Sequence, residues 1–226
     1  MKGYAICTSQ RTGSTYLCRL LRSTGVLGNP GEYFDAGARR RMGLEPHAND
    51  PEGQFASILE AGATPNGVYG VKLFPPQFDW AARTKWVTRL PNLRFIFLRR
   101  WDLLGQALSQ ARAWQTLQWT SLHEARGQAA YDGKLIQERL LEILRHNARW
   151  EFYFARNGIR PLHLYYEDIL ADPGRAVGAV ARALGVEGEI VVDLSKVTLE
   201  VQRTAETEDW RARFLAEARD LTVMHA

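Results

Sequence analysis

Residues 6–17 read ICTSQRTGSTYL, and this stretch is the clearest indication of the fold. It begins as an apolar strand, passes through a turn of small and polar residues, and ends as the opening of an amphipathic helix. Such a turn points successive backbone N–H groups into one small volume at a helix N-terminus, where the helix dipole also favours negative charge. The stretch therefore predicts a phosphate-binding loop after the first strand of an α/β protein.

The cation of this loop is not where the P-loop of nucleotide-hydrolysing proteins has it. The pattern G-x-x-x-x-G-K-[ST] places a Lys after its last Gly, and that Lys reaches the β- and γ-phosphates. Here Ser14 and Thr15 follow Gly13, and the only cation in the loop sequence is Arg11. We therefore expect a nucleotide without a triphosphate. A small-residue turn that binds nothing is the alternative.

Further strands and helices alternate along the chain. Strands are expected at residues 4–8, 68–73, 94–98 and 162–165. Helices are expected at residues 14–23, 51–61, 103–114, 132–155 and from 172–174 to 184, with residues 36–65 otherwise a polar connection. Continuous apolar runs such as RFIFL are typical of parallel sheets covered on both faces. The pattern predicts an α/β fold, a P-loop-type parallel β-sheet flanked by helices on both faces, in a single domain spanning residues 1–226.

Composition excludes several classes of protein. The chain has 226 residues, of which 46% are hydrophobic and 24% charged, as in ordinary globular domains rather than disordered or fibrous chains. The net charge is +4, but the basic residues do not form the stripe that nucleic-acid-binding proteins carry, so no nucleic-acid partner is expected. The two cysteines and five histidines lack ligand spacing, so no metal site is expected.

The sequence also favours a cytoplasmic location. No apolar run approaches the roughly 18 residues needed to span a bilayer. The first seven residues turn polar too quickly for a signal peptide. Two cysteines that read as small buried hydrophobic residues fit a reducing compartment. We therefore expect no integral membrane segment.

A second anion site is predicted after the third strand. Ligands of parallel sheets bind beyond the carboxyl ends of the strands. Arg99 and Arg100 stand at the end of a buried strand, where they are costly unless they meet an anion or a carboxylate. An Arg at this strand tip and Ser109 on the following helix can clamp one phosphate from two sides. Pairing of an Arg with the local Asp102 is the alternative.

Five stretches taken together resemble a known family. They are SQRTGST, NPGEYF, GVKL, RRWDLLGQALSQARAWQT and LYYEDILADP, spread from residue 9 to residue 173. In this order they resemble the bacterial trehalose sulfotransferases and their relatives. The resemblance implies transfer of a sulfuryl group from 3′-phosphoadenosine 5′-phosphosulfate (PAPS) to a hydroxyl of a carbohydrate or glycolipid acceptor, with no metal. It also implies a possible homodimer, since related enzymes can be homodimers.

The resemblance assigns residues to the nucleotide. Arg11 takes the place of the cation beside the bridging oxygen of the leaving phosphate. The 5′-phosphosulfate cradle is assigned to Thr12, Gly13, Ser14 and Thr15. Arg100 and Ser109 become the 3′-phosphate grip. The family's Arg usually precedes its Ser by eight positions, and that position is Trp101 here, so Arg100 takes the contact with Arg99 as the fallback.

Glu32 and Lys72 are the further candidates for catalysis. In related sugar sulfotransferases, a Glu in the position of Glu32 is the proposed general base. Glu32 follows a Pro-Gly turn and precedes Tyr33 and Phe34, which we expect to desolvate its carboxylate and raise its pKa. A solvated loop carboxylate is the alternative. Lys72 interrupts an apolar strand, and either forms a local salt bridge or helps to hold the sulfuryl group.

The C-terminal region resembles the segment that covers the nucleotide in many sulfotransferases. In it, Trp210 would shield the adenine and Arg203 would approach the 3′-phosphate. An exposed amphipathic helix is the alternative. Trp101, Trp114 and Trp119 are candidates for the floor of a sugar pocket, although core positions explain them equally well.

Two other functions remain open at this point. One is a nucleotide-dependent phosphotransferase of kinase type, which would need ATP, Mg²⁺ and normally the loop Lys. The other is a non-catalytic nucleotide- or glycan-binding protein of the same fold. The acceptor itself is not predicted, because residues 36–65, which should shape acceptor specificity, carry no readable motif.

Overall fold

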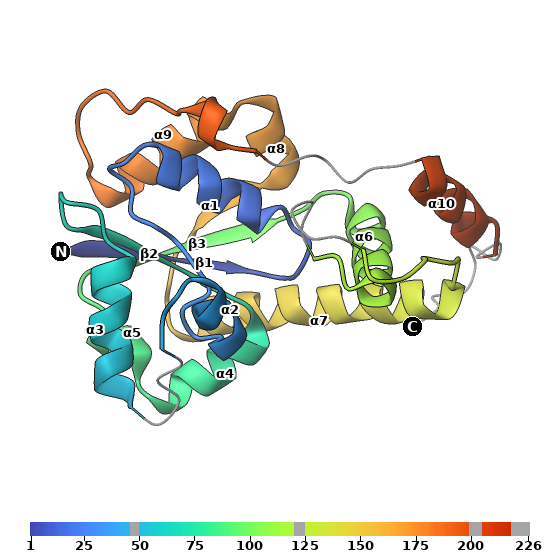
Figure 1. The fold of residues 1–226 in the computed structure, drawn as a ribbon, viewed down its shortest axis with the longest axis horizontal. Helices are drawn as coiled ribbons and strands as arrows, with labels where there is room; N and C mark the ends of the chain where they lie inside the picture. The colour runs from blue at the N-terminus through green and yellow to red at the C-terminus, as the bar shows by residue number, and fades with distance from the viewer. Residues whose placement is uncertain (46–49, 120–124, 199–204, 218–226) are drawn as a thin grey trace. The chain divides into compact units, whose positions relative to one another are not determined.

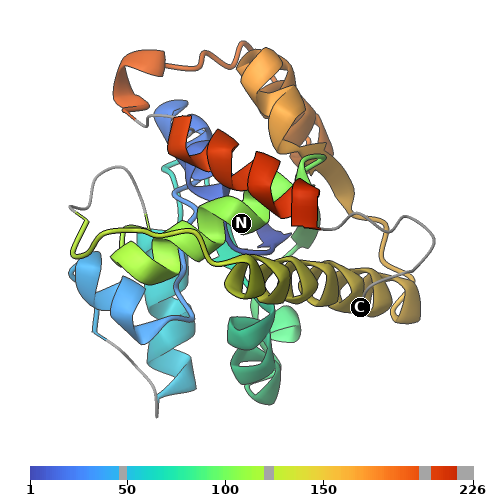
Figure 2. The ribbon, with the colours of Figure 1, turned by 90° about the vertical axis from the view of Figure 1, so that its right-hand side faces the viewer.

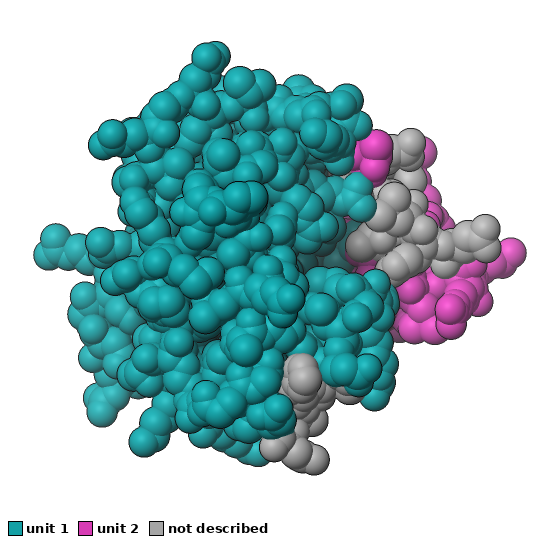
Figure 3. Space-filling view, turned by 60° about the vertical axis from the view of Figure 1, so that its left-hand side comes forward, with its two compact units in different colours: residues 1–99, 146–197 teal, residues 100–145, 198–226 magenta. Residues whose placement is uncertain are grey.

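The computed structural model describes residues 1–45, 50–119, 125–198 and 205–217. The chain divides into two compact units (Figure 3). Unit 1 comprises Met1–Arg99 and His146–Val197, and unit 2 comprises Arg100–Arg145 and Thr198–Ala226. The single domain over residues 1–226 stays a prediction.

Unit 1 contains a four-stranded parallel sheet (Figure 1). Its strands are β1 (Lys2–Thr8), β2 (Val68–Leu73), β3 (Leu93–Arg99) and β4 (Leu162–Tyr165), in the order β2-β1-β3-β4. The register pairs Cys7 with Leu73 and Thr8 with Leu98. The carboxyl ends of β1, β2 and β3 therefore meet at one edge of the sheet, where the loops that follow these strands begin.

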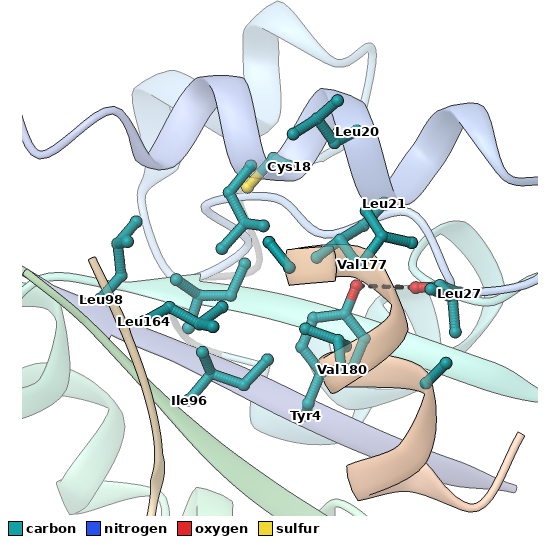
Figure 4. Close-up of a cluster of buried hydrophobic side chains, with 14 of the residues drawn as sticks. Tyr4, Cys18, Leu20, Leu21, Leu27, Ile96, Leu98, Leu164, Val177 and Val180 are labelled. Atoms are coloured by element: carbon teal, nitrogen blue, oxygen red, sulfur yellow. Dashed lines mark hydrogen bonds between the residues drawn. The ribbon is translucent and has the colours of Figure 1, made fainter. Parts of the chain in front are cut away.

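Helices cover both faces of this sheet, as predicted. Side chains alternate along β1, so Tyr4 and Ile6 enter one apolar cluster while Ala5 and Cys7 enter the other. The first cluster is closed by α1 (Ser14–Ser23), α8 (Tyr166–Ala171) and α9 (Pro173–Leu184). Figure 4 shows this cluster, with the Tyr4 hydroxyl donating to the Leu27 carbonyl at 2.7 Å.

The second face carries an aromatic cluster. It is closed by α3 (Pro51–Ala61), α4 (Pro75–Arg83), α5 (Trp86–Arg89) and the last turns of α7 (Gly133–Arg156). Trp150 of α7 stacks on Phe154 at 6.0 Å and meets Phe78 of α4 edge-on at 5.2 Å. Both cysteines are free and buried, Cys7 in this cluster and Cys18 in the first one.

Residues 36–65 contain more structure than predicted. The helix α3 has the predicted bounds, but α2 (Ala36–Arg41) precedes it in what was expected to be a polar connection. The Asp35 carboxylate caps α2 by accepting from the Ala38 N–H at 2.6 Å. The short helices α4, α5 and α8 were also not predicted. Helices of four to nine residues offer too few turns for a periodic pattern to stand out.

Unit 2 is helical. Its described residues include α6 (Leu103–Thr116), the first part of α7 and α10 (Ala205–Glu217), which packs against α6 (Figure 2). Their shared cluster consists of Ala107, Leu108, Ala111, Ile136, Ile143 and Trp210. A short 3-10 helix, Leu194–Lys196, belongs to unit 1.

No helix within the described residues is long and apolar enough to cross a membrane. The cytoplasmic location and the homodimer stay predictions.

Candidate functional site

The loop between β1 and α1 turns through two left-handed residues. Arg11 has φ 61° and Gly13 has φ 80°. A residue with a side chain is uncommon in this region, and such positions cluster at functional sites. Gly13 is favoured here because only glycine adopts this φ without strain. It is also favoured because a Cβ there would lie 2.2 Å from the ring of Tyr166 on α8. With these two left-handed residues the chain turns directly into α1.

Gly13→Ala is therefore expected to lower the free energy of unfolding by about 3 kcal/mol, from left-handed strain plus displacement of the Tyr166 ring. Gly25→Ala is the matched control, because Gly25 has φ +68° but nothing within 4 Å of the added Cβ. The control should lose only about 1 kcal/mol. Urea denaturation measures both, and equal losses would show that the Tyr166 contact costs nothing.

Hydrogen bonds within the protein fix the loop between β1 and α1. The Thr12 hydroxyl donates to the Ser9 carbonyl at 3.0 Å and lies 2.6 Å from the Thr8 hydroxyl. From α7, the Trp150 indole donates to the Thr8 carbonyl at 2.9 Å, and Asn147 accepts from the Ser9 hydroxyl at 3.1 Å. The Thr12 hydroxyl is therefore engaged in hydrogen bonds within the protein. In the predicted phosphate cradle, Thr12 would contribute its backbone N–H rather than its hydroxyl.

The loop presents the N-terminus of α1. Among the residues that the structure describes, no side chain caps this helix, and its N-cap is Gly13. The first N–H groups of a helix have no acceptor within the helix, so an uncapped start is suited to an anion. Ser14 and Thr15 occupy this first turn, with Ser14 buried and Thr15 half-buried. Their contact with a 5′-phosphosulfate stays a prediction.

A buried ion pair lies beside this turn. Lys72 Nζ at the end of β2 is 2.7 Å from Glu32 Oε1 and 3.5 Å from the Thr15 hydroxyl. The other carboxylate oxygen of Glu32 accepts from Gln77 Nε2 at 3.0 Å. The local salt bridge predicted as one role of Lys72 is confirmed. Its contact with a sulfuryl group stays a prediction.

The predicted direction of the Glu32 pKa is wrong. Burial does raise the pKa of Glu32, but the charge of Lys72 and the hydrogen bonds from Lys72 and Gln77 outweigh it and hold the pKa below its usual value. Burial lowers the pKa of Lys72, but Glu32 outweighs it and leaves that pKa raised. Tyr33 and Phe34 belong to the buried aromatic cluster, so they anchor the turn.

The GEYF turn that carries Glu32 is fixed by its backbone. The Gly31 carbonyl accepts from the Lys72 N–H at 2.8 Å. The Tyr33 carbonyl accepts from Gln54 at 3.0 Å and from Arg39 at 3.4 Å. Arg39 is 1% exposed, and Ser57 accepts from its guanidinium at 2.9 Å. The main chain on both sides of Glu32 is thus held by hydrogen bonds within the protein.

The two arginines at the end of β3 have different partners. Arg99 donates to Glu151 at 2.8 Å and to the Tyr165 hydroxyl at 2.6 Å, and its guanidinium lies 4.8 Å from the centre of the Phe97 ring. The guanidinium of Arg99 is therefore held by side chains of unit 1 at the edge of the sheet. Arg99 is therefore the poorer candidate for a phosphate, and Arg100 remains the predicted one.

In unit 2, Asp102 lies between two arginines. Arg100 Nη2 is 3.9 Å from Asp102 Oδ2, which is the local pairing considered as an alternative, and Arg211 of α10 donates to the same oxygen at 2.6 Å. Asp102 also caps α6 by accepting from the Gly105 N–H at 2.8 Å. Burial raises the pKa of Asp102, but the Arg211 and Gly105 hydrogen bonds and the nearby charges hold it below its usual value.

The other candidates of unit 2 are placed as follows. Residues 208–211 lie in a helix, α10, and Trp210 is 3% exposed within the apolar cluster of this unit. Ser109 is half-buried on α6. Arg203 lies outside the described residues. The roles of Ser109, Arg203 and Trp210 toward the nucleotide stay predictions. The floor of a sugar pocket also stays a prediction. Of its candidate residues, Trp101 is 61% exposed and Trp114 is 48% exposed.

Comparison with protein families identifies the chain. The model of the Stf0 sulphotransferase family matches residues 3–217. The chain belongs to the Stf0 sulphotransferase family. This sulfotransferase is 26% identical to the trehalose 2-sulfotransferase of Mycobacterium tuberculosis (strain ATCC 35801 / TMC 107 / Erdman), with 96% of each chain covered. It is also 26% identical to the trehalose 2-sulfotransferase of Mycolicibacterium smegmatis (strain ATCC 700084 / mc(2)155), with 95% of each covered.

A solved structure shares the fold. The crystal structure of a sulfotransferase from Alicyclobacillus acidocaldarius matches this sulfotransferase with a TM-score of 0.51 at 14% identity, covering 98% of both chains. At that identity the likeness concerns the fold alone. Within the described ranges, no group of three or more His, Cys, Asp or Glu side chains is placed to hold a metal ion.

Sequence reasoning missed two residues that shape the site of this sulfotransferase. Gln77 contacts Glu32 from 45 positions away, and Arg39 supports the turn from α2, which lies within the predicted polar connection. A local signal for α4 does exist, because two prolines followed by Gln at the third helical position mark a helix start. Nothing local indicates that this Gln meets Glu32.

Proposed function

We propose that this sulfotransferase transfers the sulfuryl group of PAPS to a hydroxyl of a carbohydrate or glycolipid. One observation carries the proposal: Lys72 joins the Glu32 carboxylate at 2.7 Å to the first turn of α1 at 3.5 Å. A candidate base and a candidate cation thus lie beside the predicted phosphate loop, all within unit 1. The names of the two trehalose 2-sulfotransferases support a sugar acceptor.

The residues present fit a nucleotide with a single 5′ phosphosulfate. The loop offers the uncapped start of α1, the left-handed Arg11 and the nearby ammonium of Lys72. PAPS supplies an activated sulfuryl group whose leaving group is a phosphate oxygen. No Lys follows Gly13, which separates the loop from ATP-dependent phosphotransferases.

In the proposed mechanism, Glu32 accepts the proton of the acceptor hydroxyl as its oxygen forms a bond to sulfur. The bond between sulfur and the bridging oxygen breaks, and its electron pair goes to the phosphate of the departing nucleotide. Arg11, the N–H groups of α1 and Lys72 stabilise the charge that grows on this phosphate. As in phosphoryl transfer, the protein contributes alignment and electrostatic stabilisation rather than a covalent intermediate.

The proposal is tested with PAPS labelled in its sulfuryl group. The acceptors are trehalose, other mono- and disaccharides, a glycolipid, a phenol and a sterol. Label should appear on at least one sugar-bearing acceptor and on neither the phenol nor the sterol. Calorimetry should show that adenosine 3′,5′-bisphosphate binds more tightly than AMP and ATP. Phosphate transfer from ATP, or no label on any sugar, would overturn the proposal.

Arg100→Ala should remove most of the preference for adenosine 3′,5′-bisphosphate over AMP. Loss of a charge-assisted hydrogen bond to the 3′-phosphate corresponds to roughly 10- to 100-fold in that ratio of dissociation constants. Arg99→Ala is the matched control, since Arg99 is held by Glu151 and Tyr165. It should leave the ratio within about threefold, because its contacts are internal. Arg100→Ala with an intact ratio would refute the assignment.

A further inference from the structure

Gln77 occupies a position in which both ends of its side-chain amide are used. Its Oε1 accepts from the backbone N–H of Phe74 at 3.0 Å, at the start of α4. Its Nε2 donates to Glu32 Oε2 at 3.0 Å. Because a backbone N–H only donates, it fixes the amide with its oxygen toward Phe74. The NH₂ group must therefore face the carboxylate.

The two oxygens of Glu32 are thus held by two different donors. Lys72 binds Oε1 at 2.7 Å and Gln77 binds Oε2 at 3.0 Å. The pair fixes the rotation of the carboxylate plane about its last bond, which a single partner leaves free. Since the Glu32 side chain is still 23% exposed, a lone pair can remain accessible to an acceptor hydroxyl.

We propose that Gln77 is a positioning residue for the sulfuryl-transfer reaction, which aims the Glu32 carboxylate at the acceptor hydroxyl and keeps it ionised. This inference rests on the proposed function, because it takes Glu32 as the general base. Gln77 itself touches neither donor nor acceptor in this role. It acts through Glu32, by donating one hydrogen bond from the start of α4, where its own Oε1 accepts from the Phe74 N–H.

The residue type at position 77 follows from its two tasks. A Glu at the third helical position would also accept from the Phe74 N–H, and is a common choice there. Its second oxygen would then face the Glu32 carboxylate, and two carboxylates at hydrogen-bond distance cannot both stay ionised. Gln caps the helix equally well and supplies a donor instead.

Other charged and titratable groups also act on Glu32. Lys72 of β2 is the strongest, and Arg41 of α2 lowers the pKa of Glu32 more weakly. From α1, Cys18 faces the pair as a neutral thiol, since burial raises its pKa. None of these groups lies on α4. Changes at Gln77 therefore alter the carboxylate without removing its main cation.

The test compares Gln77→Glu and Gln77→Leu with wild type in the enzyme that comprises residues 1–226. Gln77→Glu retains the cap of α4, whereas Gln77→Leu removes both the cap and the donor. The control is Gln137→Glu, which adds the same charge at an exposed position of α7. In both Gln77 variants the acidic limb of the pH profile of kcat/KM should move up by about one pH unit. At neutral pH, kcat should fall about tenfold with the affinity for adenosine 3′,5′-bisphosphate unchanged.

A second readout does not need turnover. ¹³C NMR of the Glu32 carboxyl carbon, assigned by its absence in Glu32→Gln, should titrate at higher pH in both Gln77 variants than in wild type and Gln137→Glu. A merely structural Gln77 would lower the melting temperature of Gln77→Leu but move neither the titration nor the pH profile, and that result overturns the inference. If the titration moves while wild type transfers no sulfuryl group, the proposed function fails and the hold of Gln77 on Glu32 stands.

Discussion

Replacement of Glu32 with Gln should lower the turnover of sulfuryl transfer by roughly 100-fold or more, as expected for loss of a general base. The amide keeps the shape of the side chain and can still accept from Lys72, but it cannot take the proton of the attacking hydroxyl. The affinity for adenosine 3′,5′-bisphosphate should survive, because the contacts of Glu32 are with Lys72 and Gln77 rather than with the loop. Initial-rate kinetics and calorimetry measure the two quantities on the same preparation.

A matched control removes a carboxylate elsewhere in unit 1. Glu52 is 79% exposed and pairs with Arg89 at the surface, so Glu52→Gln should leave turnover unchanged. Thermal unfolding of both variants separates a chemical loss from a folding defect. Turnover of Glu32→Gln within about threefold of wild type would exclude Glu32 as the base.

Lys72→Met should lower the free energy of unfolding by about 2–3 kcal/mol at neutral pH. The side chain is 8% exposed, and its removal leaves the Glu32 carboxylate buried without its main partner. The figure is below that for a fully buried pair, because the Glu32 side chain is 23% exposed and water can partly screen it. Urea denaturation measures the loss, and turnover should fall in parallel.

The double variant Glu32→Gln, Lys72→Met is the control for this loss. With both charges gone no orphaned ion remains, so it should be more stable than Lys72→Met alone. If the two single losses simply add, the two side chains do not stabilise each other.

The pH dependence of stability follows from the same pair. In wild type the pKa of Glu32 is depressed, so its contribution is present above the usual carboxyl pKa and is lost as pH falls through the folded value. In Lys72→Met, burial is no longer outweighed, and the pKa of Glu32 rises. At mildly acidic pH, protonation of Glu32 then removes the unpaired buried charge from the variant. The difference in free energy of unfolding between wild type and Lys72→Met should therefore narrow as pH falls.

The strands and the loop were predictable from sequence because their signals are local. The bounds of β2, β4, α1 and α3 agree with the predictions, since apolar runs and caps mark them within a few residues. These features depend on neighbours in the chain, which a single sequence displays. Glu32 lies beside Lys72, whose ammonium is 2.7 Å from its carboxylate, and its role as a base stays a prediction.

The electrostatics of the site could not be derived in this way. The pKa of Glu32 is lowered by Lys72 and Gln77, which lie 40 and 45 residues further along the chain. A prediction from its neighbours Tyr33 and Phe34 therefore gave the wrong direction for this pKa. The supporting role of Arg39 is equally distant from any local pattern, because it arises where α2, α3 and the turn meet. Charge pairing in a fold is a property of tertiary contacts, whereas strands and caps are properties of short segments.

The burial of the two cysteines has a practical side. Cys7 and Cys18 lie beneath opposite faces of one sheet, and burial raises the pKa of both thiols, so neither is a ready nucleophile. Alkylating reagents can reach them only after a layer of helices has lifted from the strands. The rate at which each sulfur is modified therefore reports how often the helices on its own side of the sheet open.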